Sequence, residues 1–80
     1  MSRLTLYQRD ECHLCELAWE VLARAGVAEF DSVFIDGEAE LEQRYGLRVP
    51  VLGIQGAASA AVRELDWPFD ADQVRAALSA

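Results

Sequence analysis

The only two cysteines of the chain, Cys12 and Cys15, are separated by two residues, and the only histidine, His13, lies between them. In the first turn of a helix this spacing places the two Cα atoms ~5 Å apart, a separation that a disulfide tolerates. The unpaired N–H groups and positive end of the helix would favour the thiolate form of the first cysteine. A pair that can both react and close predicts thiol–disulfide exchange.

Three other uses of the pair compete with this prediction. A structural disulfide explains the spacing poorly, because closing so short a loop removes little entropy from the unfolded chain. Two thiolates could hold zinc or part of an iron–sulfur cluster, but the chain has no third cysteine. His13 is poorly placed to share a metal with both thiolates, so we predict no metal site within one chain. A metal or cluster carrier built on a dimer, and a binding module whose cysteines sense redox state, remain the alternatives.

Position predicts different roles for the two thiols. Cys12 lies nearer the exposed helix end and should attack, whereas Cys15 lies a turn deeper and should resolve the mixed disulfide. The local charges oppose one another: Arg9 and the helix terminus favour the thiolate, whereas Asp10 and Glu11 disfavour it. The sequence leaves the sign of their sum open.

The two residues between the cysteines, His13 and Leu14, are candidates to modulate the redox poise of the pair. A protonated imidazole would stabilise a neighbouring thiolate, but an exposed imidazole is mostly neutral at pH 7. A solvent-facing histidine with a modest effect is therefore an equally good interpretation.

The pair lies between a predicted strand and a predicted helix. The strand covers Leu4–Tyr7 and breaks at Gln8, and Asp10 is the expected N-cap, which puts residues 11–13 in the first helical turn. Gly26 would end the helix, and Phe30–Ile35 reads as a second strand, parallel to the first. The predicted apolar stripe of the helix consists of Leu14, Leu17, Ala18, Val21, Leu22 and Ala25.

The second half of the chain supplies a short helix, a hairpin and a last helix. Residues 36–45 read as an acidic helix with Leu41 and Tyr45 facing inward, and its glutamates as a solvated face. Strands are expected at Val51–Ile54 and Ala60–Leu65, joined by a turn at 55–58. The last helix carries a capping box of Asp70 with Gln73 and a hydrophobic staple of Phe69 with Val74. The glutamates assigned to the solvated face are Glu38, Glu40 and Glu42.

The order β-α-β-α-β-β-α predicts one α/β domain over residues 1–80, with three layers and a four-stranded mixed sheet. Fourteen acidic residues against seven arginines give a net charge of −7, which disfavours nucleic acid and anionic membranes as partners. The first strand begins at Leu4 with no signal peptide before it, and no apolar run is long enough to span a membrane. We therefore expect a cytoplasmic monomer.

A proline, Pro50, stands at the entrance of the third strand. It could simply start the strand, as prolines commonly do. Alternatively, a cis Val49–Pro50 bond would turn the backbone of Val49 toward the cysteines and offer its edge groups to an extended substrate. From the residues alone both interpretations stay open.

A cysteine pair after the first strand and a Val49-Pro50 step before the third, in this element order, resemble the thioredoxin superfamily and its glutaredoxins in particular. Arg9, three residues before Cys12, matches the basic residue of glutaredoxins, and no carboxylate lies in the first strand. The tail Glu64–Asp70 is similar to that of a group of short glutaredoxin-like proteins. The resemblance covers about residues 3–79.

The resemblance implies a thioredoxin-like, glutaredoxin-type fold and a thiol–disulfide oxidoreductase that reduces protein or glutathione-mixed disulfides. Cys12 would be the nucleophile, Cys15 the resolving thiol and Pro50 the cis-proline. No cofactor would be bound permanently, and glutathione is a candidate co-substrate. The implied substrate-binding residues are Tyr7, Arg9, Arg48, Val49 and Pro50.

The sequence departs from the glutaredoxin pattern at two points. His13-Leu14 replaces the usual proline–aromatic pair between the cysteines, and Leu65-Asp66-Trp67-Pro68 replaces a Gly-Gly turn before the last helix. Trp67 would either cover the glutathione groove or cap the core beneath the last helix, and we favour the core. The departures bear on the use of glutathione more than on the redox chemistry.

Overall fold

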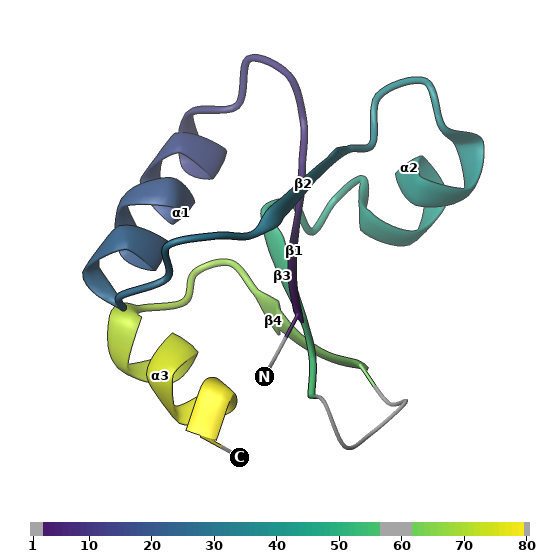
Figure 1. Cartoon of the computed structure of the whole chain (residues 1–80). Helices are drawn as coiled ribbons and strands as arrows, with labels where there is room; N and C mark the ends of the chain where they lie inside the picture. Colours follow the sequence, from purple (N-terminus) through teal and green to yellow (C-terminus); the bar gives the residue numbers. More distant parts are fainter. Residues whose placement is uncertain (1–2, 57–61, 80) are drawn as a thin grey trace.

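The computed structural model describes residues 3–56 and 62–79 and has the predicted element order (Figure 1). The elements are β1 (Arg3–Gln8), α1 (His13–Arg24), β2 (Asp31–Phe34), α2 (Ala39–Tyr45), β3 (Val51–Gln55), β4 (Val62–Asp66) and α3 (Ala71–Ser79). Part of the predicted hairpin turn and the start of its second strand, residues 57–61, lie outside the described residues. None of the described helices is long and apolar enough to cross a membrane.

The four strands form one mixed sheet in the order β2-β1-β3-β4. β1 pairs in parallel with β2, as the crossover through α1 requires, and antiparallel with β3, which in turn pairs antiparallel with β4. In Figure 1 α1 and α3 lie on one side of the sheet and α2 lies on the other. The predicted three-layer α/β architecture is confirmed.

The alternation of side chains along the central strands builds a core on each face of the sheet. Leu6 of β1 lies opposite Leu52 of β3, and both are fully buried on the α1–α3 face. Tyr7 lies opposite Val51 and packs with Tyr45 on the α2 face. The two central strands, β1 and β3, therefore contribute side chains to the core on each face of the sheet.

The first helix begins later than predicted. Cys12, not Asp10, is the N-cap, and the side chain of Asp10 instead accepts a hydrogen bond from the Glu11 N–H at 3.2 Å. Glu11 has a φ of 53°, so the chain turns through the left-handed region just before Cys12 and cannot be helical there. Residues 11 and 12 therefore precede the helix rather than form its first turn.

The buried face of α1 follows the predicted stripe except in its first turn: Ala18 and Leu22 are buried, and Val21 and Ala25 pack against the core. Its fully enclosed positions are Cys15, Ala18 and Leu22, whereas Leu14 is 45% exposed. Leu14 lies ~100° around the helix from Cys15, which takes the inward position in the first turn. The end of the helix follows the prediction: Gly26, with a φ of 85°, is the C′ residue, and the Val27 N–H donates to Leu22 O.

The last helix follows its sequence signals closely. The Gln73 N–H donates to Asp70 Oδ1 and the Asp70 N–H to Gln73 Oε1, both at 2.8 Å, which is the predicted capping box. Phe69 and Val74 are buried in the same core cluster, as a staple requires. Trp67 packs against that cluster and meets Phe69 edge-on, with ring centroids 5.1 Å apart, so its core role is confirmed.

Tyr45, at the end of α2, joins that helix to the far strand of the sheet. Its ring stacks on Tyr7 with centroids 4.2 Å apart, and its hydroxyl donates to Glu64 Oε2 of β4 at 2.6 Å. Arg48 binds Glu64 at 2.9 Å and Asp66 at 2.7 Å. The hydrogen bond from Tyr45 and the bond from Arg48 lower the pKa of Glu64, and burial chiefly raises the pKa of Tyr45.

Removing the capping box should destabilise the protein measurably. Asp70→Ala is expected to lower the free energy of unfolding by about 1 kcal/mol, because the Gln73 N–H at the start of α3 loses its side-chain acceptor. Urea denaturation measures the change. Asp72→Ala, which removes a neighbouring and highly exposed carboxylate paired only on the surface, is the control and should cost clearly less.

The hydrogen bond from Tyr45 predicts a dependence of stability on acid pH. Because the folded pKa of Glu64 is lowered, its stabilisation is fully present above the ordinary glutamate pKa and is lost as pH falls through the folded pKa. Tyr45→Phe should raise the pKa of Glu64 toward its ordinary value and flatten this acid limb. NMR titration of the Glu64 carboxyl and urea denaturation against pH measure both effects, and an unchanged carboxyl pKa would contradict the assignment.

Candidate active site

The two cysteines form a disulfide at the start of α1, with their Cα atoms 5.2 Å apart. Cys12 is the N-cap, and its Sγ accepts a hydrogen bond from the Cys15 N–H at 3.1 Å. A backbone donor at this place favours negative charge on the Cys12 sulfur when the bond is open. Cys12 is partly exposed, whereas Cys15 is only 2% exposed. The outer sulfur is thus the accessible one and the inner sulfur is covered.

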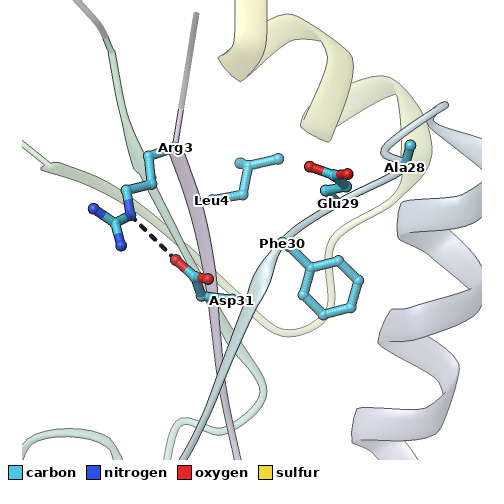
Figure 2. Close-up of a pocket in the computed structure, with 6 residues that line it drawn as sticks. All are labelled: Arg3, Leu4, Ala28, Glu29, Phe30 and Asp31. Carbon is cyan, nitrogen blue, oxygen red and sulfur yellow. Dashed lines mark hydrogen bonds and ion pairs between the residues drawn. The ribbon is translucent and has the colours of Figure 1, made fainter.

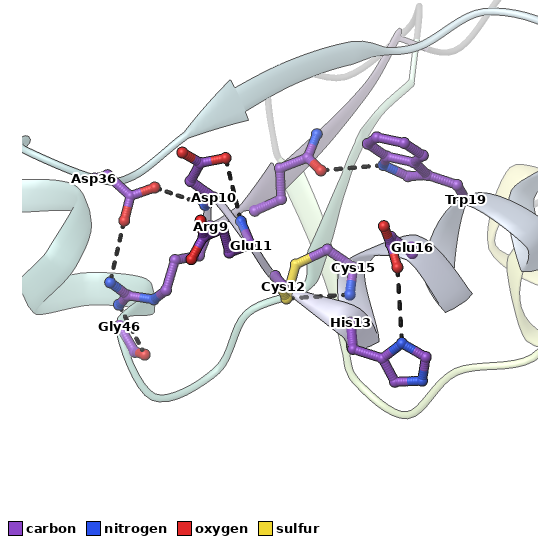
Figure 3. The surroundings of a disulfide bond; sticks show 11 residues. Arg9, Asp10, Glu11, Cys12, His13, Cys15, Glu16, Trp19, Asp36 and Gly46 are labelled. Atoms are coloured by element: carbon purple, nitrogen blue, oxygen red, sulfur yellow. Dashed lines mark hydrogen bonds and ion pairs between the residues drawn. A yellow bond between two sulfur atoms is a disulfide. The ribbon is translucent and has the colours of Figure 1, made fainter.

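A small pocket of about 150 Å³ lies beside the disulfide. Figure 3 shows several of its residues around the Cys12–Cys15 bond, with Asp10 and Glu11 before it and Glu16 after it. Its aromatic members, Trp19 and Phe34, are 44% and 48% exposed. The lining residues are Gln8, Arg9, Asp10, Glu11, Cys12, Cys15, Glu16, Trp19 and Phe34.

Gln8 is a functional candidate that the sequence reasoning missed. It was expected to end the strand as a polar break, but it is the last residue of β1 and only 1% exposed. Its Oε1 accepts a hydrogen bond from the Trp19 indole N–H at 3.1 Å, and its Nε2 has no partner within the described protein. The signal was the strand period: Leu4, Leu6 and Gln8 alternate along one face, which makes Gln8 an inward position.

Arg9 binds elsewhere than at the cysteines. Its guanidinium pairs with Glu42 at 2.5 Å and Asp36 at 3.3 Å and also donates to Gly46 O. The two carboxylates raise the pKa of Arg9, the hydrogen bond to Glu42 most. Figure 3 shows Arg9 extending toward Asp36 and Gly46 and away from the disulfide. The assignment of Glu42 to a purely solvated face is therefore wrong. A substrate role for Arg9 stays a prediction that would require it to exchange these partners.

Asp36 fastens the loop before the cysteines as well. Its second oxygen accepts a hydrogen bond from the Asp10 N–H at 2.7 Å. One carboxylate after β2 therefore holds both the side chain of Arg9 and the backbone of the next residue. This contact fixes the chain that leads into Cys12.

The other predicted substrate-binding residues gather around Tyr45. Tyr7 stacks on its ring, and Arg48 lies over the ring while bound to two carboxylates of β4. The Val49 N–H donates to Tyr45 O at 3.0 Å, and Pro50 is buried after a cis peptide bond. Arg48 is thus part of an ion-pair network rather than a free positive charge. The binding roles of these residues stay predictions.

The two residues between the cysteines face solvent. His13 is 80% exposed, with Nδ1 3.7 Å from Glu16 Oε2, and Leu14 is 45% exposed. Neither is enclosed by the protein, so any influence on the disulfide acts from the solvent side.

A larger hollow of about 580 Å³ lies far from this chemistry. It is formed at the first residues of β1 and β2, around the ion pair of Arg3 with Asp31, with Leu4 and Phe30 beside it (Figure 2). The cysteines follow the other end of β1. Within residues 3–56 and 62–79, no cluster of three or more His, Cys, Asp or Glu side chains could hold a metal ion.

Comparisons with known proteins agree with this geometry. The model of the glutaredoxin-like domain (DUF836) matches residues 3–79. The sequence of protein XcR50 from X. campestris, in its crystal structure, is 59% identical to this chain; the TM-score is 0.81, and the match covers 95% of each chain. The solution structure of XcR50 gives 58% identity and a TM-score of 0.80, and the match covers 96% of this chain and 92% of that one. Protein Ne2328 from Nitrosomonas europaea is 33% identical with a TM-score of 0.70, over 96% of this chain and 91% of that one. No curated protein matches the sequence.

The fold agrees with the thioredoxin-like, glutaredoxin-type arrangement that the sequence resemblance implied. The disulfide between Cys12 and Cys15, at the mouth of α1, supports a thiol-redox role. The family model matches nearly the whole sequence, and the solved relatives have the same fold. This chain therefore belongs to the glutaredoxin-like (DUF836) family.

Proposed function

We propose that the protein is a small thiol–disulfide oxidoreductase that reduces protein or glutathione-mixed disulfides. The observation that carries the proposal is the asymmetry of the closed pair, in which Cys12 is partly exposed and Cys15 is 2% exposed. An incoming disulfide can reach the first sulfur but not the second. The resolving thiol is therefore kept for the internal step.

The reaction runs in two exchanges. The Cys12 thiolate attacks one sulfur of the substrate disulfide, forms a mixed disulfide with it and releases the other sulfur as a thiolate. Cys15, after losing its proton to solvent, attacks the Cys12 sulfur and releases the second substrate thiolate. Two cysteine thiols are oxidised to one disulfide, and the substrate disulfide is reduced to two thiols. A low-molecular-weight thiol or a dithiol reductase would then restore the open form.

The surroundings of the pair support this division of labour. The Cys15 N–H already points at the Cys12 sulfur, so a donor is in place for the attacking thiolate without any rearrangement. Val49 and Pro50 are the residues we propose for the peptide backbone of the substrate. The Val49 N–H is bound to Tyr45 O, so pairing with a substrate falls to its carbonyl group. A cytoplasmic location remains part of the proposal.

Single cysteine variants test the assigned order of attack. Cys15→Ser should accumulate a mixed disulfide with an added peptide disulfide, because its first exchange proceeds and its second cannot. Cys12→Ser should accumulate none, because its remaining thiol is covered. Mass spectrometry of the intact protein after quenching measures both.

The same assay separates the proposal from its alternatives. Equal trapping by both variants would contradict the roles of the two sulfurs. An absence of trapping and of turnover by the parent protein, together with bound iron or zinc after purification, would favour a metal carrier instead.

A further inference from the structure

We propose that the pocket beside the disulfide selects substrate disulfides that lie in basic protein segments, in preference to the anionic glutathione. This inference rests on the proposed function and adds a substrate class to it. Three features of the pocket support this inference: an acidic rim, an aromatic wall and a buried hydrogen-bond donor without a partner.

The rim of the pocket is acidic. Asp10, Glu11 and Glu16 all line it and all are exposed. The one cationic side chain among the lining residues, Arg9, is already bound to Glu42 and Asp36. An incoming group at the Cys12 sulfur therefore meets a net negative field, which attracts cations and repels a ligand that carries carboxylates.

The wall of the pocket suits the same kind of group. Trp19 and Phe34 expose nearly half of their surface beside these carboxylates. An aromatic face next to carboxylates binds arginine and lysine side chains well, through cation–π contact and apolar contact with their stems. A pocket of about 150 Å³ holds one side chain, so selection acts on the residues that flank the substrate cysteine.

Gln8, one of the residues that line the pocket, carries a buried donor without a partner within the described protein. The Trp19 indole can only donate, so the Gln8 atom that faces it must be Oε1, and this fixes the other atom of the amide as Nε2. That nitrogen is buried and has no partner within the described protein. Leaving such a donor unpaired costs free energy, which a carbonyl oxygen of a bound segment would recover.

Two chromogenic peptide probes test the charge selection. Each carries Leu-Cys at its centre in a disulfide with thionitrobenzoate, and arginine flanks this centre in one probe and glutamate in the other. In the reduced Cys15→Ser variant, the Cys12 thiolate forms a mixed disulfide with the peptide and releases the coloured thiolate. We expect the basic probe to react about tenfold faster at low salt and the ratio to shrink at high salt.

Charge variants show whether the pocket is responsible. In the Cys15→Ser background, the combination Asp10→Asn, Glu11→Gln and Glu16→Gln should bring the ratio close to one. The matched control, Glu29→Gln, Glu38→Gln and Glu40→Gln, changes the net charge equally on exposed residues that do not line the pocket, and should keep the ratio. Equal rates of the two probes, or an equal effect of both combinations, would overturn the inference.

The role of Gln8 has a separate readout. Gln8→Met keeps the length of the side chain and removes the amide, and should slow both peptide probes while leaving hydroxyethyl disulfide, which has no peptide carbonyl, unaffected. A similar slowing of all three would reveal a purely structural role and overturn this part. If no probe reacts with the parent protein, the proposed function itself fails, which is a different result from equal rates.

Discussion

The start of α1 at Cys12 is the constraint on which the site depends. A sulfur takes the place that a hydroxyl or carboxylate oxygen usually holds at a helix N-terminus, and it accepts the N–H of the residue three positions on. Because that residue is Cys15, one helical turn defines both the separation of the sulfurs and their unequal access to solvent. The rest of the domain serves to hold this turn at the end of β1.

The arginines predicted to bind substrate instead form ion pairs within the protein. Arg9 ties the end of β1 to α2 through Glu42 and Asp36, and Arg48 similarly ties the segment before β3 to Glu64 and Asp66 of β4. Both arginines of the expected substrate site are therefore already neutralised. The side chains that remain exposed around the disulfide are acidic and aromatic, whereas a surface that binds carboxylates would expose basic side chains.

Much of the fold followed from local sequence signals because those signals are short-range. The capping box of Asp70 with Gln73 and the end of α1 at Gly26 each depend on contacts within a few residues, and both were predicted correctly. The parallel pairing of β1 with β2 followed from the length of the crossover between them.

Two of the errors, those at Asp10 and Glu42, arose where a distant part of the chain decides the outcome. Asp10 has the composition of an N-cap, but Asp36 binds its backbone N–H, and Glu11 turns the chain before the helix starts. Glu42 reads as a surface residue until Arg9 is placed beside it. Gln8 reads as the end of a strand because its amide is polar, although the strand period puts it inside. The accessibility of the cysteines likewise required the folded structure.

The contact of Asp36 with the Asp10 N–H has a kinetic consequence for the disulfide. It anchors the segment before Cys12 to the β2–α2 connection by groups that do not include either sulfur, so the same anchor is available when the bond is open. A Cys15 thiolate and a mixed disulfide on Cys12, both held on a fixed frame, would react with each other at a high effective molarity. Ring closure would then outpace capture of the intermediate by free thiols in solution, and electrons would leave the protein in pairs.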